Sequence, residues 1–401
     1  MISLNDDSDC TDAAARPPAS GPQLRTMPHD LDLISGKRLA NVEIAYETWG
    51  ELDEHGTNAI YICHALTGDS HVAEGPGPGG VEKPGWWDVM VGPGQAVDTN
   101  KYFVICSNVL GGCSGTTGPG STDPSTAKPY GLGFPLVTIE DMVNAQALLL
   151  DELGVGRLLA VIGGSVGGMQ ALAWAKQYPE RVQTCIGVAT TPRLGAQAIG
   201  FNEVGRQAIL ADTDFKGGAY YDGPQPEQGL AIARMVGHIT YLSDESMRAK
   251  FGRRLQKRAY HAFDFVTEFE VESYLSYQGR KFVERFDANT YLYMTKAMDY
   301  FDLASGFNSV AEALNGTPVR FLLLTFTSDW LFPTYQTTGL VDALRAVGAE
   351  VSFAEIPSPY GHDAFLLEPE EQRRYIEPFL DRARCEALSR VATSIEAGEP
   401  S

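Results

Sequence analysis

Runs of apolar residues that are not interrupted by polar ones most constrain the fold of this 401-residue chain. Such runs are typical of strands buried on both faces of a parallel sheet, because a sheet with one wet face shows alternation instead. The runs occupy residues 58–63, 102–106, 158–162, 182–188, 319–326 and 351–356. Helix-like stretches separate them. The sequence therefore predicts an α/β fold with a mostly parallel sheet flanked by helices.

One of the intervening helices can be predicted from its first residue to its last. The Thr138 hydroxyl can cap a helix, and Asp141 stands where the second half of a capping box is expected. Apolar residues then recur at helical spacing until Gly154, a residue typical of helix ends.

The strand pattern stops between residues 191 and 317, a stretch too long for a loop and rich in helix-like segments. We predict that residues 191–317 form a helical lid inserted into an α/β core of residues 26–190 and 318–385. Residues 1–25 are rich in Asp, Ala, Pro and Ser, which predicts a disordered tail. Residues 386–401 are predicted to be a second tail.

Composition excludes several classes of partner. The net charge of −20 argues against nucleic acid and against anionic membrane surfaces, since both require a basic patch. The two long uncharged runs, 102–122 and 158–175, contain too much Gly and polar residue for a bilayer span, and the acidic N-terminus is unlike a signal peptide. The six cysteines show no metal-site spacing, so we expect reduced thiols in a cytoplasmic protein.

The segment Gly163-Gly164-Ser165-Val166-Gly167 matches the G-x-S-x-G pattern of a nucleophile elbow. A predicted strand precedes it and a helical segment follows, as such a turn requires. Glycine leaves room for a turn this tight, and the turn presents the serine oxygen in an accessible, strained position. Ser165 is therefore the candidate nucleophile, although the bare pattern also occurs by chance in Gly-rich chains.

A serine hydroxyl needs a base that is oriented by a carboxylate, expected in the chain order Ser, Asp, His. His362 follows the strand predicted at 351–356, and Asp329 follows the strand predicted at 319–326. Both would lie at the carboxyl edge of the sheet, where open α/β folds bind ligands. Taken singly, His362 fits a surface loop and Asp329 fits a helix cap. Their order favours a triad.

Two backbone N–H groups are candidates for an oxyanion hole. The N–H of Val166 lies at the start of the helix after the nucleophile, where it would face the developing negative charge. The second donor normally comes from a loop after an early strand, and Leu66 in His64-Ala-Leu-Thr-Gly68 is in that place. We interpret His64 as a structural residue of this loop.

Several long motifs, in order, resemble the homoserine O-acyltransferases of the α/β-hydrolase superfamily, of the MetX type. The resemblance covers residues 30–380 or so. The motifs are HALTGDSH (64–71), GWWDVMVGPG (85–94), NVLGGCSGTTGP (108–119), GGSVGGMQ (163–170), ARMVGHITY (233–241) and GHD (361–363).

The resemblance implies ping-pong acyl transfer in methionine biosynthesis, from acetyl-CoA through an acyl-Ser165 intermediate to the hydroxyl of L-homoserine. It implies that Arg234 binds the carboxylate of the amino acid, that Asp363 binds its ammonium group and that Tyr241 is a further contact. It also implies a homodimer formed through the helical insertion. Val166 departs from the methionine usual after the nucleophile, and we expect its side chain near the acyl pocket.

Other functions remain open on the sequence. A succinyl donor would require a cation in the acyl pocket, for which Lys296 is a candidate, and L-serine is an alternative acceptor. An esterase would use the same triad with water, because fold and triad do not fix the acceptor. A scaffold that has lost catalysis would lack a triad member, and none is missing. We expect no metal and no cofactor, since no metal-ligand cluster or phosphate-binding loop is apparent.

Overall fold

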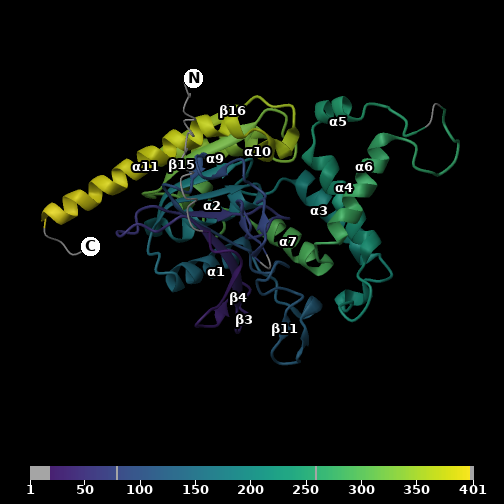
Figure 1. Cartoon of the computed structure of the whole chain (residues 1–401), viewed down its shortest axis with the longest axis horizontal. Coiled ribbons are helices and arrows are strands. Elements are labelled where there is room, and N and C mark those ends of the chain that lie inside the picture. The colour runs from purple at the N-terminus through teal and green to yellow at the C-terminus, as the bar shows by residue number, and fades with distance from the viewer. Residues whose placement is uncertain (1–18, 78–79, 258–259, 398–401) are drawn as a thin grey trace, which may run out of the picture.

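The computed structural model describes residues 19–77, 80–257 and 260–397, and an eight-stranded sheet lies at its centre (Figure 1). The strands, in spatial order, are β1 (Gln23–Thr26), β4 (Glu43–Trp49), β10 (Phe103–Ser107), β5 (Ala59–Cys63), β13 (Leu158–Gly164), β14 (Val182–Val188), β15 (Arg320–Phe326) and β16 (Val351–Ile356).

The six predicted strands are confirmed, and from β10 to β16 each pairs with its neighbour in parallel. The prediction missed β4 and β1, which pair antiparallel at one edge. β4 carries both buried and partly exposed side chains, so it lacks the uninterrupted apolar run that marks the parallel strands.

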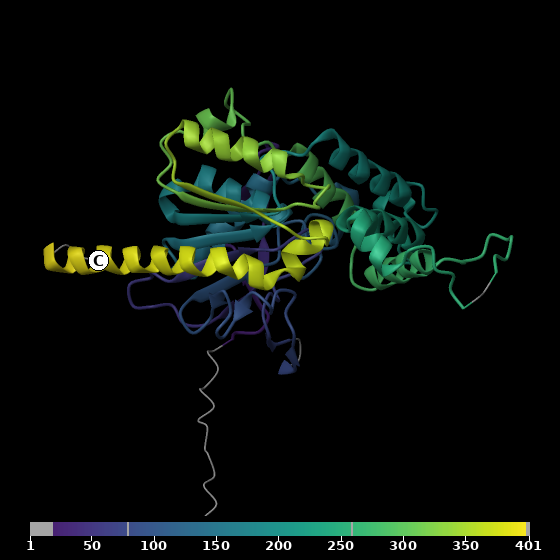
Figure 2. The same cartoon turned by 90° about the horizontal axis from the view of Figure 1, so that it is seen from above.

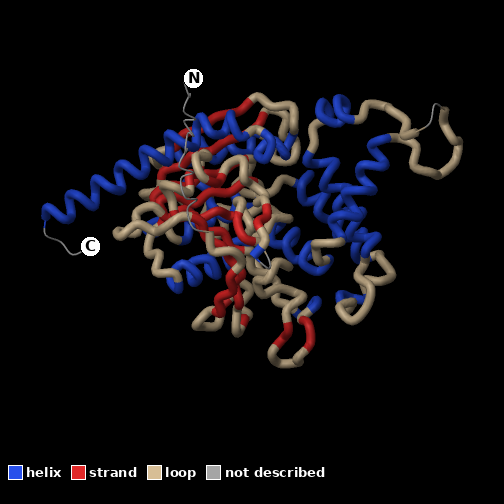
Figure 3. The backbone as a smooth tube through the Cα atoms, in the orientation of Figure 1, coloured by secondary structure: helices blue, strands red, loops and turns tan. Residues whose placement is uncertain are grey.

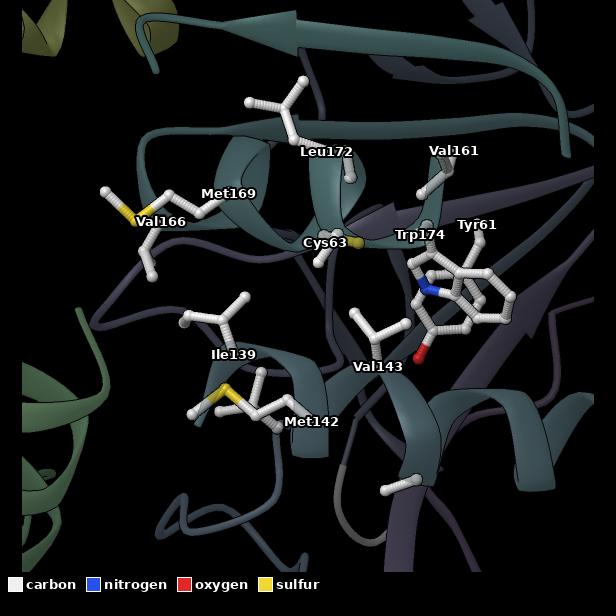
Figure 4. Packing of buried hydrophobic residues seen from close by; sticks show 14 of the residues in the cluster. Tyr61, Cys63, Ile139, Met142, Val143, Val161, Val166, Met169, Leu172 and Trp174 are labelled. Atoms are coloured by element: carbon white, nitrogen blue, oxygen red, sulfur yellow. The ribbon is translucent and has the colours of Figure 1, made fainter. Parts of the chain in front are cut away.

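Helices cover both faces of the sheet. α1 (Ile139–Glu152), α2 (Val166–Gln177) and α9 (Thr334–Ala346) pack on the face that also buries Tyr61 and Cys63. The long α11 (Pro369–Ala397) packs on the opposite face, against which Ile60 and Ile62 are buried. This alternation gives β5 a fully buried side chain at every position. Figure 4 shows part of the first core, between α1, α2 and β5.

The predicted start of α1 is confirmed. The Thr138 hydroxyl accepts a hydrogen bond from the Asp141 N–H at 3.1 Å, and the Asp141 carboxylate accepts one from the Thr138 N–H at 2.9 Å. Both halves of the capping box are therefore present. The helix ends at Glu152, two residues before Gly154.

Between β14 and β15 the described residues form helices and no strand of the central sheet (Figure 3). The helices are α3 (Ala196–Leu210), α4 (Glu227–Tyr241), α5 (Asp244–Lys250), α6 (Glu270–Val283), α7 (Ala288–Tyr300) and α8 (Val310–Ala313). In both cartoon views α3 to α6 lie to one side of the sheet, opposite the free end of α11 (Figures 1 and 2). This lid has a small core of its own, which includes Phe282, Phe286 and Tyr291.

Short elements complete the described chain. Two-residue strands pair as β2 (Leu31–Asp32) with β3 (Arg38–Leu39), β6 (Gly75–Pro76) with β7 (Glu82–Lys83), β8 (Val91–Gly92) with β9 (Val97–Asp98), and β11 (Thr122–Asp123) with β12 (Lys128–Pro129). Helix α10 (Ala364–Leu367) and single turns at Gly131–Gly133, Pro179–Arg181, Lys216–Gly218 and Gly361–Asp363 are the remaining elements.

Both predicted tails require correction at their inner boundaries. The N-terminal tail was predicted to reach residue 25, but Gln23–Thr26 forms β1 because its backbone pairs with β4. The C-terminal tail was predicted to start at 386, but α11 continues to Ala397. Residues 1–18 and 398–401 lie outside the described residues. Among the helices that the structure describes, none is long and apolar enough to cross a membrane.

Candidate active site

Ser165 lies in the turn between β13 and α2, as predicted. Its backbone has φ 58° and ψ −127°, a conformation that residues with a side chain rarely adopt. Hydrogen bonds hold the turn on both sides: the Ser165 N–H donates to the Val188 carbonyl, and the Ser165 carbonyl accepts from the Thr190 hydroxyl and from the Gly168 N–H. Strain of this kind persists where the surrounding structure enforces it, most often at functional sites.

The glycines on either side of Ser165 are required by close contacts of the backbone. A Cβ atom on Gly163 would lie 2.2 Å from the Gly167 carbonyl carbon and oxygen. A Cβ atom on Gly167 would lie 2.1 Å from the carbonyl oxygen of Cys63, at the end of β5. The two absent side chains thus allow α2 to begin directly against the end of β5.

The structure brings Ser165, His362 and Asp329 together from three strand ends. The His362 Nε2 lies 2.8 Å from the Ser165 Oγ, and its Nδ1 lies 2.8 Å from the Asp329 Oδ2. All three residues are buried. Because an ionised carboxylate only accepts, Nδ1 carries the proton and Nε2 is free to accept the proton of the Ser165 hydroxyl. This is the arrangement that a general base requires.

The Asp329 carboxylate and the His362 ring have further contacts that restrict their orientation. The Asp329 Oδ1 accepts the backbone N–H groups of Leu331 and Phe332 at 3.0 and 2.9 Å. The Phe332 ring stacks on the His362 ring with centroids 4.9 Å apart. The carboxylate and the imidazole therefore have little freedom to turn, which keeps the base aimed at Ser165.

The oxyanion loop, residues 64–68, follows β5. The Leu66 side chain lines the same pocket as Ser165. Among the described residues, neither the Leu66 N–H nor the Val166 N–H donates a hydrogen bond to another protein group. His64 has the structural role predicted for it, since its Nδ1 donates to the Ala65 carbonyl and its Nε2 accepts from the Val109 N–H.

The predicted acceptor residues lie at the lid side of the triad. Arg234 and Tyr241 belong to α4, and the Arg234 guanidinium lies 5.6 Å from the centre of the Tyr241 ring. The Tyr241 ring is in turn 6.2 Å from the His362 ring. Asp363 directly follows His362. No ion pair joins Arg234 to a carboxylate within the described residues; its polar contacts are with the Thr67 hydroxyl at 3.4 Å and with Tyr241.

Burial raises the pKa of Asp363 above that of an ordinary aspartate, while the nearby His362, Arg234 and Lys250 oppose the rise. Burial also raises the pKa of Tyr241, and Arg234 opposes that rise too. Asp363 and Arg234 are thus both half-buried near His362, and no ion pair joins them within the described residues. Such an arrangement suits a ligand that carries both charges.

A small pocket lies at Ser165. Its lining comes from the oxyanion loop, the lid and the Asp329 loop. The lining residues are Leu66, Ser165, Leu194, Ala198, Phe201, Asn202, Val236, Gly237, Thr240, Tyr241, Tyr291, Met298, Leu331 and Phe332. No lysine or arginine is among them.

The structure places two further residues that the sequence analysis related to this pocket. The Val166 side chain does not line it: it is fully buried in the core, close to Ile139 in Figure 4, because the first turn of α2 directs it toward α1. Lys296 lies on α7, in a separate surface pocket beside Lys37 and Arg206. Lys296 is therefore not a cation of the acyl pocket.

Two contributors to the site were not predicted. Phe332 stacks on the His362 ring and fixes its orientation. In the sequence, its position three residues after Asp329 only weakly indicates this contact. Arg285 donates to the Thr67 carbonyl at 2.9 Å from the lid, and nothing in the sequence near it indicates this contact. Within the described residues, no group of three or more His, Cys, Asp or Glu side chains is placed to hold a metal ion.

The strained serine turn, the hydrogen-bonded triad and the parallel sheet define a serine-dependent enzyme of the α/β-hydrolase class. A family model described as "alpha/beta hydrolase fold" matches residues 58–369. The "Homoserine O-acetyltransferase" of Methanohalobium evestigatum is 56% identical over 357 residues, which are 88% of this chain and 72% of that protein. The chain therefore belongs to the homoserine O-acetyltransferase family within the α/β-hydrolase superfamily.

Solved structures agree on the fold and differ in their activities. The homoserine O-acetyltransferase from Bacillus anthracis has a TM-score of 0.84 and 31% identity, covering 90% of this chain and 97% of that one. A structure titled "Crystal structure of esterase E22" has a TM-score of 0.82 and 29% identity, covering 90% of this chain and all of that one. The shared fold therefore does not by itself decide between the two activities.

The geometry predicts that His362 activates Ser165. His362→Ala should slow covalent labelling of Ser165 by a fluorophosphonate by about 10³-fold or more, because the hydroxyl then keeps its proton. The exposed His55, far along the chain from the triad, offers a matched control in His55→Ala. Intact-mass spectrometry over time measures the adduct. Equal labelling rates for His362→Ala and the unaltered protein would contradict the assignment of the base.

Proposed function

We propose that this chain transfers an acetyl group from acetyl-CoA to the hydroxyl of L-homoserine, a step of methionine biosynthesis. The observation that carries the proposal is a serine triad beside a cation, Arg234, that has no ion-pair partner in the described residues, with Asp363 adjacent to the catalytic base. The family membership supports the same reaction, since relatives over most of the chain carry this name.

The first half-reaction follows from the triad. The Ser165 Oγ attacks the thioester carbonyl carbon while His362 Nε2 takes its proton, and the carbonyl oxygen becomes an oxyanion. The free N–H groups of Leu66 and Val166 are the donors proposed for that charge. When the tetrahedral intermediate collapses, the C–S bond breaks and the CoA thiolate leaves with the proton from His362. The products are acetyl-Ser165 and free CoA.

The second half-reaction reverses these roles. The homoserine hydroxyl gives its proton to His362 and attacks the acetyl carbon, and the bond from that carbon to Ser165 Oγ then breaks. Ser165 regains the proton, and O-acetylhomoserine leaves. Arg234 would bind the carboxylate of the acceptor with its planar fork, and Asp363 would bind the ammonium group. Held in this way, the hydroxyl outcompetes water by proximity.

An acetyl donor fits the pocket better than a succinyl donor. A succinyl group would place a carboxylate in the pocket, and burying an unpaired charge is costly. The lining residues include no lysine or arginine, and Lys296 lies elsewhere. L-serine is a weaker candidate acceptor, because its hydroxyl is one carbon closer to the charges that Arg234 and Asp363 would hold. An esterase remains the alternative from another class, favoured by the likeness to esterase E22.

The reaction is tested by following free thiol with acetyl-CoA or succinyl-CoA, with and without L-homoserine. We expect thiol release that requires homoserine and prefers acetyl-CoA. Ser165→Ala should reduce it by roughly 10⁴-fold or more, because the nucleophile is gone. Release at the same rate without homoserine would identify water as the acceptor. A preference for succinyl-CoA would overturn the assignment of acetyl-CoA as the donor.

The charges proposed for the acceptor are tested one at a time. Arg234→Met should raise the KM for homoserine by roughly 10- to 100-fold, the usual worth of a charged hydrogen bond. The variant should leave the KM for 3-amino-1-propanol unchanged, because this acceptor lacks the carboxylate. Asp363→Asn should likewise raise the KM for homoserine. It should leave the KM for 4-hydroxybutyrate unchanged, because that acceptor lacks the ammonium group. If either variant weakens both truncated acceptors equally, that residue does not bind the charge assigned to it.

The raised pKa of Asp363 gives this binding a pH dependence. As pH falls through that pKa the carboxyl becomes neutral, so the KM for homoserine should rise at a higher pH than an ordinary aspartate would give. The Asp363→Asn variant, which has no charge to lose, should not show this rise.

We further propose a homodimer formed through the lid. Phe263 and Phe265, between α5 and α6, are almost fully exposed, and Tyr277 on α6 is half exposed. Exposed aromatic groups can contribute to an interaction surface where they form a contiguous patch. Light scattering at micromolar concentration should give twice the chain mass, and a monomeric mass would reject the dimer.

We also propose a cytoplasmic location. The five described cysteines are unpaired, which supports it.

A further inference from the structure

Arg285 belongs to the lid and contacts the oxyanion loop. It lies in the turn between α6 and α7, and its Nη1 donates to the Thr67 carbonyl at 2.9 Å. Thr67 directly follows Leu66, whose N–H is the proposed oxyanion donor. The Arg234 Nη1 lies 3.4 Å from the Thr67 hydroxyl. Two lid arginines thus contact one residue of the loop, one through its backbone and one through its side chain.

The turn that carries Arg285 is anchored on both sides. Phe282 and Phe286 stack with ring centroids 4.6 Å apart inside the lid core. The Asp287 carboxylate accepts a hydrogen bond from the Tyr220 hydroxyl at 2.6 Å and caps α7 by accepting the Thr290 N–H at 2.7 Å. Arg285 is therefore presented to the loop by a segment with little freedom.

The loop is held from below by core residues. Gln170 Nε2 donates to the His64 carbonyl at 3.2 Å, and Gln146 donates to the Gln170 side-chain oxygen at 2.7 Å. The Gly68 N–H closes a turn onto the Ala65 carbonyl. On the lid side, the Leu66 side chain packs against the lid core as well as the main core. The contacts of Arg285 and Arg234 with Thr67 hold the loop on the side that faces the lid.

The positively charged guanidinium groups of Arg234 and Arg285 repel each other. Their common position beside Thr67 therefore needs another explanation than attraction between charges. Both lie over the same Phe282 ring, at 4.7 Å for Arg234 and 5.5 Å for Arg285. Arg285 is an exposed residue, and its bond to Thr67 is at the surface. The desolvation of its guanidinium and the Arg234 charge still lower its pKa, with Asp69 opposing. A carbonyl oxygen that accepts from Arg285 offsets part of this cost.

We infer that Arg285 is a positioning residue, which holds the Thr67 carbonyl and thereby fixes the Leu66 N–H toward the oxyanion at Ser165. The inference rests on the proposed function, in which Leu66 is an oxyanion donor. It means that the oxyanion hole is complete only when the lid is seated on the core. Arg285 then assists the acylation of Ser165 without touching donor or acceptor.

The test uses p-nitrophenyl acetate, which has no phosphate and no carboxylate for an arginine to bind. Ser165 Oγ attacks its carbonyl, the ester C–O bond breaks, p-nitrophenolate leaves, and His362 takes the serine proton. The burst of p-nitrophenolate in stopped flow therefore reports acylation alone. Arg285→Ala should slow the burst by about tenfold, less than the loss of an entire oxyanion donor. The KM for homoserine in the full reaction should stay within about twofold, because binding of the acceptor is assigned to other residues.

Two variants separate positioning from folding. Arg285→Lys keeps a donor for the Thr67 carbonyl and should restore most of the burst rate. Arg280→Ala changes a neighbouring arginine of α6 whose hydrogen-bond partner among the described residues is Ser276, and it should leave the burst unchanged. Thermal unfolding is measured for all three. If Arg285→Ala is not obtained folded, the comparison of Arg285→Lys with the unaltered protein decides.

A normal burst in Arg285→Ala with a raised KM for acetyl-CoA or homoserine would overturn the inference and make Arg285 a ligand for a substrate anion. If both Arg285 variants lose burst rate to a similar extent and both also unfold at a lower temperature, Arg285 has a structural role instead. Neither result depends on which acceptor the enzyme uses. Failure of the proposed function would appear separately, as thiol release from acetyl-CoA that does not require homoserine.

Discussion

The close approach of α2 to the end of β5 is the constraint on which the site depends. Because Gly167 lacks a side chain, its backbone lies directly against the Cys63 and His64 carbonyls. This contact places the nucleophile turn beside the oxyanion loop, since β5 leads straight into that loop. The strain at Ser165 has the same origin: the serine must reverse the chain between a central strand and a helix that is packed too closely for a wider turn.

The carboxyl edge of the sheet then determines which other segments can contribute. β15 and β16 run parallel to β13, so the loops after them end at the same edge and bring Asp329 and His362 to Ser165. The lid is fastened to these loops directly. Trp330 donates its ring N–H to the Leu242 carbonyl, and a side chain on Gly361 would collide with the backbone of Tyr241 and Ser243. Lid position and triad geometry are therefore linked through backbone contacts.

The sequence predicted those parts of the structure that depend on local pattern. Uninterrupted apolar runs identified the parallel strands, and the capping residues identified the start of α1. The order of Ser165, Asp329 and His362 indicated a triad because strand ends in a parallel sheet converge. Strand β4 was missed since its side chains are not uniformly apolar, and β1 because its short polar sequence is a strand only through pairing with β4.

The direction of side chains on helices was not predictable in the same way. Val166 was expected near the acyl pocket, and Lys296 was a candidate cation only for a succinyl donor; Val166 is buried in the core shared with α1, and Lys296 lines a separate pocket. Arg285 could not be predicted, because its partner Thr67 is 218 residues away in the sequence. Which face of a helix meets the site depends on packing between distant segments, and a single sequence does not specify it.

The choice between transfer and hydrolysis follows from what surrounds the acyl-enzyme, because triad and fold are common to both. The Ser165 pocket is lined mainly by apolar side chains and its triad is buried, but His362 could activate water as well as an acceptor hydroxyl, so the acceptor must be decided by what binds beside the acyl group. Arg234 and Asp363 remain as a cation and an anion that do not pair with each other in the described structure. Together they would hold a zwitterion at fixed distance from the acyl carbon. In the proposed roles the lid would select the acceptor through Arg234, and through the contact of Arg285 with Thr67 it would support the oxyanion donor Leu66.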